Sequence, residues 1–120
     1  MISHDQNKRL LLDFLGYVDL ELNLSDNTIA AYRHDLFDFV EFLRQRSECP
    51  LTQAGDAEVL DYIINLRKNS ISARSAARRL SAIKHLYKFL LAEKHVRSDP
   101  TTSLESPKLL RALPDVLSRD

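Results

Sequence analysis

The sequence predicts an all-α fold, with four helices in one domain and an extended linker at the C-terminal end. Its 120 residues include only two glycines and four prolines, the residues that most often interrupt helices. Apolar residues make up 44% of the chain, which is enough for one modest core. Apolar positions recur at spacings of three and four, and no stretch alternates polar with apolar residues as a half-buried strand would.

The first helix is expected over residues 5–22, with Asp5 as a candidate N-cap. Its apolar residues share one helical face: Leu11, Phe14, Leu15, Val18 and Leu22. The second helix has a stronger start signal, because Ser25 is a favourable N-cap residue. This helix is expected to run to about Arg46.

The two faces of the second helix differ in character. The face expected to be buried contains Ile29, Tyr32, Leu36, Phe39, Val40 and Leu43. The opposite face contains Asn27, Ala30, Ala31, His34, Asp38 and Glu41. The first turns of this outer face are small or neutral and the later turns are acidic. If the helix contacts nucleic acid, it is therefore expected to do so with its N-terminal end.

The third and fourth helices follow a loop over residues 47–55. Asp56 is expected to cap the third helix, which reaches about Lys68. Its apolar residues are Val59, Leu60, Ile63, Ile64 and Leu66. Ser72 is a favourable N-cap for the fourth helix, which is expected to reach about Lys94. The buried face of that helix is expected to contain Ala76, Leu80, Ile83, Tyr87, Leu90 and Leu91.

The far side of the fourth helix is basic, and it belongs to a basic half of the chain. Arg74 and Arg78 lie there one turn apart. Residues 1–60 carry five Lys and Arg against eleven Asp and Glu, whereas residues 61–120 carry twelve against six. The formal net charge of zero therefore hides a strong asymmetry. The first turn of this helix has no acidic residue, so its positive N-terminus is free to approach an anion such as phosphate.

Several classes of protein are excluded by what the sequence lacks. There is no glycine-rich phosphate loop, no His-Glu-x-x-His and no paired-cysteine motif, so we expect no cofactor, no metal and no catalytic site in this chain. Tyr32 and Tyr87 lie on the faces expected to be buried, where packing explains them better than nucleophilic catalysis. A single cysteine, no apolar run long enough for a membrane span and no signal sequence favour a cytoplasmic protein that does not contact a membrane.

Two functions from different classes fit these features. The first is DNA binding through the basic helix, and the second is a helical protein–protein interaction module whose basic surface is only solvated or contacts an acidic partner. Affinity for DNA that falls steeply with salt would favour the first function. Under that function Arg78, central on the basic face, is expected to be an exposed DNA contact whose replacement by alanine leaves the fold intact.

The C-terminal end is expected to be a linker. We place the helical domain at residues 1–98 and the linker at residues 99–120, because Pro100, Pro107 and Pro114 prevent another long helix. Apolar residues that could anchor the linker are Leu104, Leu109, Leu113, Val116 and Leu117.

Three stretches of the chain carry a family resemblance: residues 24–36 (Leu-Ser-Asp-Asn-Thr-Ile-Ala-Ala-Tyr-Arg-His-Asp-Leu), residues 72–83 (Ser-Ala-Arg-Ser-Ala-Ala-Arg-Arg-Leu-Ser-Ala-Ile), and Asp99-Pro100 followed by Leu-Glu-Ser-Pro-Lys-Leu at 104–109. Together they resemble the N-terminal, core-binding domain of tyrosine site-specific recombinases of the Xer family. The likeness covers nearly the whole chain. Within the family, the Ser-Pro-Lys-Leu and the later Leu-Pro-Asp-Val-Leu-Ser at 113–118 are more similar to the XerD than to the XerC branch.

The resemblance implies a SAM-like helical domain that holds one side of a short duplex site while a C-terminal catalytic domain holds the other. The catalytic arginines, lysine, histidines and nucleophilic tyrosine of the family belong to that second domain, toward which the linker would lead. The parent protein would break and rejoin DNA through a phosphotyrosyl intermediate, as in chromosome dimer resolution. Its implied partners are a double-stranded recombination site, a related recombinase in a tetrameric synapse and a DNA translocase.

The resemblance also implies which residues contact DNA, and it places them on the second and fourth helices facing the major groove. The expected contacts are Asn27, Thr28, Ala31, His34, Arg74, Ser75, Arg78 and Arg79. An alanine such as Ala31 permits close approach of the backbone or contact with a thymine methyl group. Each arginine of the fourth helix could reach a guanine edge or a phosphate, and the sequence leaves that choice open.

Overall fold

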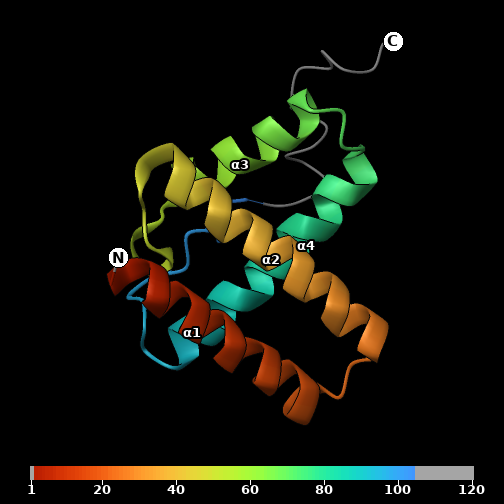
Figure 1. The fold of residues 1–120 in the computed structure, drawn as a ribbon, viewed down its shortest axis with the longest axis vertical. Helices are drawn as coiled ribbons and strands as arrows, with labels where there is room; N and C mark the ends of the chain where they lie inside the picture. The colour runs from red at the N-terminus through yellow and green to blue at the C-terminus, as the bar shows by residue number, and fades with distance from the viewer. Residues whose placement is uncertain (1, 105–120) are drawn as a thin grey trace.

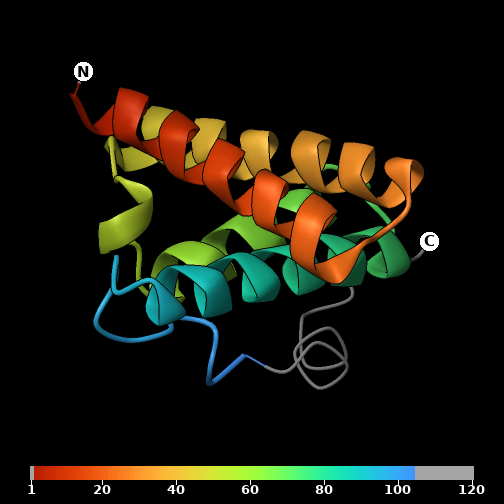
Figure 2. The same ribbon diagram turned by 90° about the horizontal axis from the view of Figure 1, so that it is seen from below.

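Four α-helices make up most of the structure, a computed structural model that describes residues 2–104. They are α1 (Ile2–Tyr17), α2 (Asp26–Ser47), α3 (Asp56–Lys68) and α4 (Ala73–Ala92). Two short elements complete the order, the π-helical turn η1 (Val18–Leu22) and the 3₁₀ turn η2 (Leu51–Gln53). Figure 2 shows two layers, with α1 and α2 in one and α3 and α4 in the other. The predicted all-α fold of four helices is confirmed.

Helix α4 provides one side of the core and contacts each of the other three helices. In Figure 1 it crosses behind α2. Its buried side chains are Ala76, Leu80, Ala82, Ile83, Leu86, Tyr87 and Leu90. They form a single hydrophobic core with fully buried residues of the other helices, among them Phe14, Phe39 and Ile63. Burial of these apolar side chains supplies the main driving force for the fold.

The caps predicted for α2 and α4 are present. The Ser25 hydroxyl oxygen accepts a hydrogen bond from the backbone N–H of Thr28 at 3.2 Å. In the same way the Ser72 hydroxyl accepts from the backbone N–H of Ser75 at 3.1 Å. Each bond satisfies one backbone donor that the first turn of a helix leaves without an intrahelical partner. The starts of both helices are thus encoded by local sequence.

The starts of the other two helices differ from the prediction. Helix α1 begins at Ile2, so Asp5 lies inside it; no glycine or proline before Asp5 interrupts the helix. Helix α3 is capped by Gly55, and Asp56 is its first helical residue. The Glu58 carboxylate accepts a hydrogen bond from the Gly55 N–H at 2.7 Å, which satisfies the backbone at this helix start.

Two leucines predicted to be buried are exposed. Leu22 is 44% exposed because it follows the buried Val18 within the π-helical turn, whose wider turn rotates it off the α-helical face. Leu91 is 41% exposed because the buried face of α4 is centred further toward Ala82 and Leu86 than the predicted face. Helix α4 also ends at Ala92 rather than at Lys94, which takes a left-handed conformation.

The connection between α2 and α3 is held by side chains from distant parts of the chain. Leu51 is fully buried at the start of η2. Its N–H donates to the Asn7 side-chain oxygen at 2.9 Å, and its carbonyl oxygen accepts from the Tyr87 hydroxyl at 2.7 Å. Tyr87 is fully buried, which confirms that packing explains it, and burial raises the pKa of its hydroxyl.

The segment after α4 packs against the helices as far as the structure describes it. Thr101 and Leu104 are both buried, and the Asp99 carboxylate accepts hydrogen bonds from the Thr101 N–H and hydroxyl. The division of the chain after residue 98 stays a prediction. The anchors predicted further along, Leu109, Leu113, Val116 and Leu117, lie outside the described residues. Within residues 2–104, no helix is both long and apolar enough to cross a bilayer.

Replacing Leu80 or Phe39 with alanine should lower the free energy of unfolding by about 2–5 kcal/mol, because each side chain is fully buried and its removal leaves a cavity. The control is Leu20→Ala, since Leu20 is 81% exposed and its loss should change stability by about 0.5 kcal/mol or less. Urea denaturation monitored by circular dichroism measures all three. Equal stability of Leu80→Ala and Leu20→Ala would contradict the core described above.

Candidate nucleic-acid interface

Helices α2 and α4 begin on the same side of the molecule and converge toward the point where they cross (Figure 1). Their capped N-terminal turns therefore open toward the same side. A helix N-terminus carries a partial positive charge, so two of them on one side favour an anionic partner there. The first turn of α4 has no acidic residue, whereas that of α2 contains Asp26.

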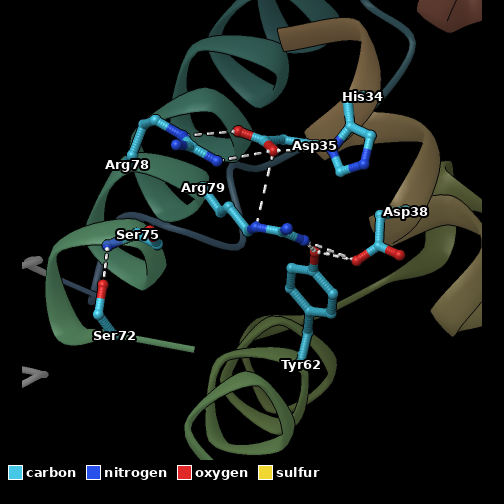
Figure 3. Close-up of polar contacts among 8 residues, drawn as sticks. All are labelled: His34, Asp35, Asp38, Tyr62, Ser72, Ser75, Arg78 and Arg79. Atoms are coloured by element: carbon cyan, nitrogen blue, oxygen red, sulfur yellow. Dashed lines mark hydrogen bonds and ion pairs between the residues drawn. The ribbon is translucent and has the colours of Figure 1, made fainter. Parts of the chain in front are cut away.

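Near the crossing, a buried carboxylate of α2 holds an arginine of α4. The Asp35 side chain is 1% exposed, and its two oxygens accept hydrogen bonds from Arg78 Nε at 3.0 Å and Nη2 at 3.1 Å. Figure 3 shows the two side chains edge to edge. This bidentate geometry is the strongest form of an arginine–carboxylate pair. The remaining nitrogen of the guanidinium, Nη1, bonds no other residue within the described range, and the Arg78 side chain is half exposed.

Arg79 points into the interior from the same helix. Its Nη1 donates to the Asp38 carboxylate at 2.8 Å and to the Tyr62 hydroxyl at 3.0 Å, and its Nε lies 3.6 Å from Asp35. The Tyr62 hydroxyl in turn donates to Asp38 at 2.8 Å. Figure 3 shows this network joining α2, α3 and α4. The Arg79 side chain is only 11% exposed, so it cannot reach another molecule without leaving these partners.

The environment of this network raises the pKa of both Tyr62 and Arg79. Burial raises the pKa of the Tyr62 hydroxyl, so it stays protonated and able to donate. Burial opposes the charged form of Arg79, but the hydrogen bond to Tyr62 and the charges of Asp35 and Asp38 outweigh it, and the pKa rises. Arg79 therefore stays charged as a structural cation between the helices.

The residues predicted to contact DNA lie along the two converging helices. Asn27 and His34 are exposed on α2, and Thr28 and Ala31 are half-buried. Arg74 is exposed and Ser75 half-buried in the first turn of α4. Arg74 bonds no other described residue, so its charge is available to a ligand. Of the predicted contact residues, the structure brings only His34, Arg78 and Arg79 together, around the carboxylate of Asp35. His34 Nδ1 lies 3.4 Å from that carboxylate.

Arg78 is exposed, as predicted, but the prediction missed that its guanidinium pairs with the buried carboxylate of Asp35. Replacing it with alanine would leave Asp35 with a weaker set of partners, so the substitution is not neutral for the fold. The assignment of Arg79 to DNA contact stays a prediction, although its burial favours a structural role.

Sequence reasoning missed Asp35 and Tyr62 as organisers of this region. A signal for Asp35 is present, because Asp35 lies three residues after Tyr32 and four before Phe39, on the apolar side of its helix. Arg79 carries a matching signal, since the buried Ala82 and Leu86 follow it at three and seven residues. Two opposite charges on the buried faces of neighbouring helices predict an ion pair.

A second polar contact joins α2 and α4 on the other side of the crossing. The Tyr32 hydroxyl lies 2.7 Å from His85 Nδ1, and burial raises the pKa of the hydroxyl. Burial and the charge of Lys88 together lower the pKa of His85 below its usual value of 6.5. Tyr32 is half-buried and stacks with Phe14, which fits the packing role predicted for it. No group of three or more potential ligands in residues 2–104 is placed to hold a metal ion.

Residues 11–94 match the protein family described as the phage integrase N-terminal SAM-like domain. Among similar curated proteins, tyrosine recombinase XerC of Roseiflexus castenholzii is 41% identical over 88% of this chain and 33% of its own length. Tyrosine recombinase XerD of Staphylococcus saprophyticus is 38% identical over 90% of this chain and 37% of its own length. Tyrosine recombinase XerD of Bradyrhizobium diazoefficiens is 42% identical over 88% of this chain and 33% of its own length.

The chain thus spans about a third of the length of the curated relatives it matches. Relatives named XerC and XerD match with similar identity, so the closer likeness to the XerD branch stays a prediction. No solved structure shows significant similarity to the chain.

Replacing Asp35 with alanine should lower the free energy of unfolding by on the order of 3 kcal/mol, because Arg79 would lose a carboxylate partner in the interior. Arg78→Ala should cost about 1–3 kcal/mol through the poorly paired Asp35. The control is Asp61→Ala, which breaks the exposed pair with Arg46 and should cost about 1 kcal/mol or less. Chemical denaturation of the three variants checks this order, and equal losses would contradict it.

His85 should titrate below about 6.5 in the folded chain, and NMR of the imidazole resonances measures this. Lys88→Ala should raise the pKa of His85, because the charge of Lys88 adds to the effect of burial, whereas Lys84→Ala should leave it unchanged and serves as the control. Below about pH 6.5, His85 binds a proton in the unfolded chain but stays neutral in the folded chain. The contribution of neutral His85 to the free energy of unfolding is therefore fully present above pH 6.5. It is lost as the pH falls from there toward the lower pKa of the folded chain. A folded pKa above 6.5 would refute this.

Proposed function

The chain belongs to the family of phage integrase N-terminal SAM-like domains, and from this membership we propose that it binds double-stranded DNA as the N-terminal domain of a Xer-type tyrosine recombinase. The observation that supports DNA binding most is the convergence of α2 and α4 with both N-termini on one side (Figure 1). Their positive ends and the exposed Arg74 and Lys88 of α4 suit a phosphate backbone.

The proposed DNA contacts fall into groups according to whether each side chain is exposed and whether it bonds another residue. Arg74 and Lys88 are exposed and bond no other described residue, so we assign them to phosphates, which attract charge without demanding orientation. Asn27, Thr28, Ala31, His34 and Ser75 are proposed to lie close to the groove, where small and polar side chains allow approach. We propose that Arg79 does not contact DNA and instead stabilises the packing of the helices.

We extend the proposal to the longer protein. Its remainder would carry the catalytic arginines, lysine, histidines and tyrosine that cut and rejoin DNA through a phosphotyrosyl intermediate, as in chromosome dimer resolution. A related recombinase in a tetrameric synapse, a DNA translocase and a cytoplasmic location complete this proposal, with a XerD-like rather than a XerC-like role. Support comes from the relatives, which are named tyrosine recombinases and are about two and a half times as long as this chain.

The 120-residue chain should bind a duplex weakly, with a Kd of about 10⁻⁴ to 10⁻⁶ M at physiological salt, because it holds only one side of the site. Affinity should fall steeply as salt rises, since phosphate contacts release counterions. Arg74→Ala should reduce the salt slope by about one unit. Fluorescence anisotropy of a labelled duplex across a salt series measures this.

The matched control is Arg46→Ala, because Arg46 lies in the last turn of α2, paired with Asp61 and away from the helix N-termini. Its loss should leave the salt slope unchanged. Binding of duplex that does not respond to salt, or no binding at all, would refute the proposed function and favour the protein–protein interaction module.

A further inference from the structure

Arg78 differs from the other exposed cations of α4 because a carboxylate on the inner side of its guanidinium holds it in one orientation. Asp35 binds the Nε and Nη2 edge of the guanidinium, and the carboxylate itself is buried at the base of the pair. Arg74 and Lys88 have no such partner among the described residues. An arginine with one edge held loses less conformational freedom when its other edge forms hydrogen bonds.

The free edge of Arg78 has the geometry of a two-pronged donor. A guanidinium carries five N–H groups, and the pair with Asp35 uses one on Nε and one on Nη2. Both N–H groups of Nη1 and the second one of Nη2 are left, and they point away from the carboxylate. Half of the side chain is exposed, so this fork is open to solvent.

The charge of Asp35 makes a phosphate a poor partner for this fork. A carboxylate about 3 Å from the guanidinium offsets much of its attraction for a second anion. A guanine edge is neutral and offers two acceptors, O6 and N7, that match a fixed arginine fork in the major groove. Apart from Arg74, the residues that precede Arg78 on the outer side of α4 are small, namely Ala73, Ser75 and Ala77, so the turn can approach base edges closely.

We propose that Arg78 reads a guanine through its free fork and that Asp35 is the positioning residue that aims it. This inference rests on the proposed function of DNA binding and adds to it a base and a residue that sets specificity. One expected result distinguishes this positioning role of Asp35 from a role in stability alone. Removing the negative charge of Asp35 should weaken base discrimination while leaving general attraction for DNA unchanged or stronger.

The test uses the 120-residue chain and a library of duplexes with a randomised tract, from which the preferred sequence is selected. Wild type should prefer G·C at one position by on the order of tenfold, and 7-deazaguanine there, which keeps O6 but lacks N7, should weaken the preference. Arg78→Lys keeps the charge but replaces the planar fork with a single ammonium group, so it should weaken the preference with its salt slope unchanged. Asp35→Asn should lose the same preference without weaker binding to unrelated duplexes. The double variant should discriminate no worse than Arg78→Lys.

Controls keep the test independent of stability. Val59→Ala removes part of a fully buried side chain of α3, lowers stability and should keep the base preference. Arg74→Ala should weaken binding to every duplex alike. Circular dichroism confirms that each variant is folded at the temperature of measurement. Where Asp35→Asn does not fold, the response of wild type and Arg78→Lys to 7-deazaguanine still decides the role of Arg78.

Three results would overturn the inference alone: salt-dependent binding of wild type without a base preference, a preference kept by Arg78→Lys, or a preference kept by folded Asp35→Asn. Absence of duplex binding by wild type would instead overturn the proposed function, and this inference with it.

Discussion

The Asp35 carboxylate is the point on which the arrangement of α2 and α4 depends. It is almost completely buried, and an unpaired charge in that position would cost several kcal/mol. Two arginines of α4 meet this requirement, one by a bidentate pair and the other at 3.6 Å. Because both must reach the same carboxylate, the two helices have little freedom to slide or rotate against each other.

The ion pairs and the hydrophobic core have different roles. A buried ion pair is weak evidence of net stability, since desolvation offsets much of the attraction. Stability comes mainly from the apolar core around Phe39, Leu80 and Tyr87. The polar network instead selects one crossing of α2 and α4, and it links that crossing to α3 through Tyr62. The side of the molecule on which both helices begin is therefore held by interior contacts at their crossing.

Local features of the sequence were enough to predict the starts of α2 and α4, the four-helix fold and most of the core. Ser25 and Ser72 cap their helices through neighbours three residues away, so no distant contact is needed. The Asp35 and Arg78 pair joins residues 43 positions apart, and only the crossing of the helices brings them together. Leu22 was mispredicted for a related reason, because a π-helical turn changes the period on which the prediction relied.

The two backbone hydrogen bonds of Leu51 have a consequence for variation in chain length. Surface connections usually tolerate insertions, but here both polar groups of one loop residue are bound by side chains of α1 and α4. An added residue between Pro50 and Gly55 would shift Leu51 out of its place and leave Asn7 and Tyr87 without partners. The exposed turn at Asn69 and Ser70 carries no such constraint from distant helices among the described contacts. Homologous chains should therefore differ in length between α3 and α4 more readily than between α2 and α3.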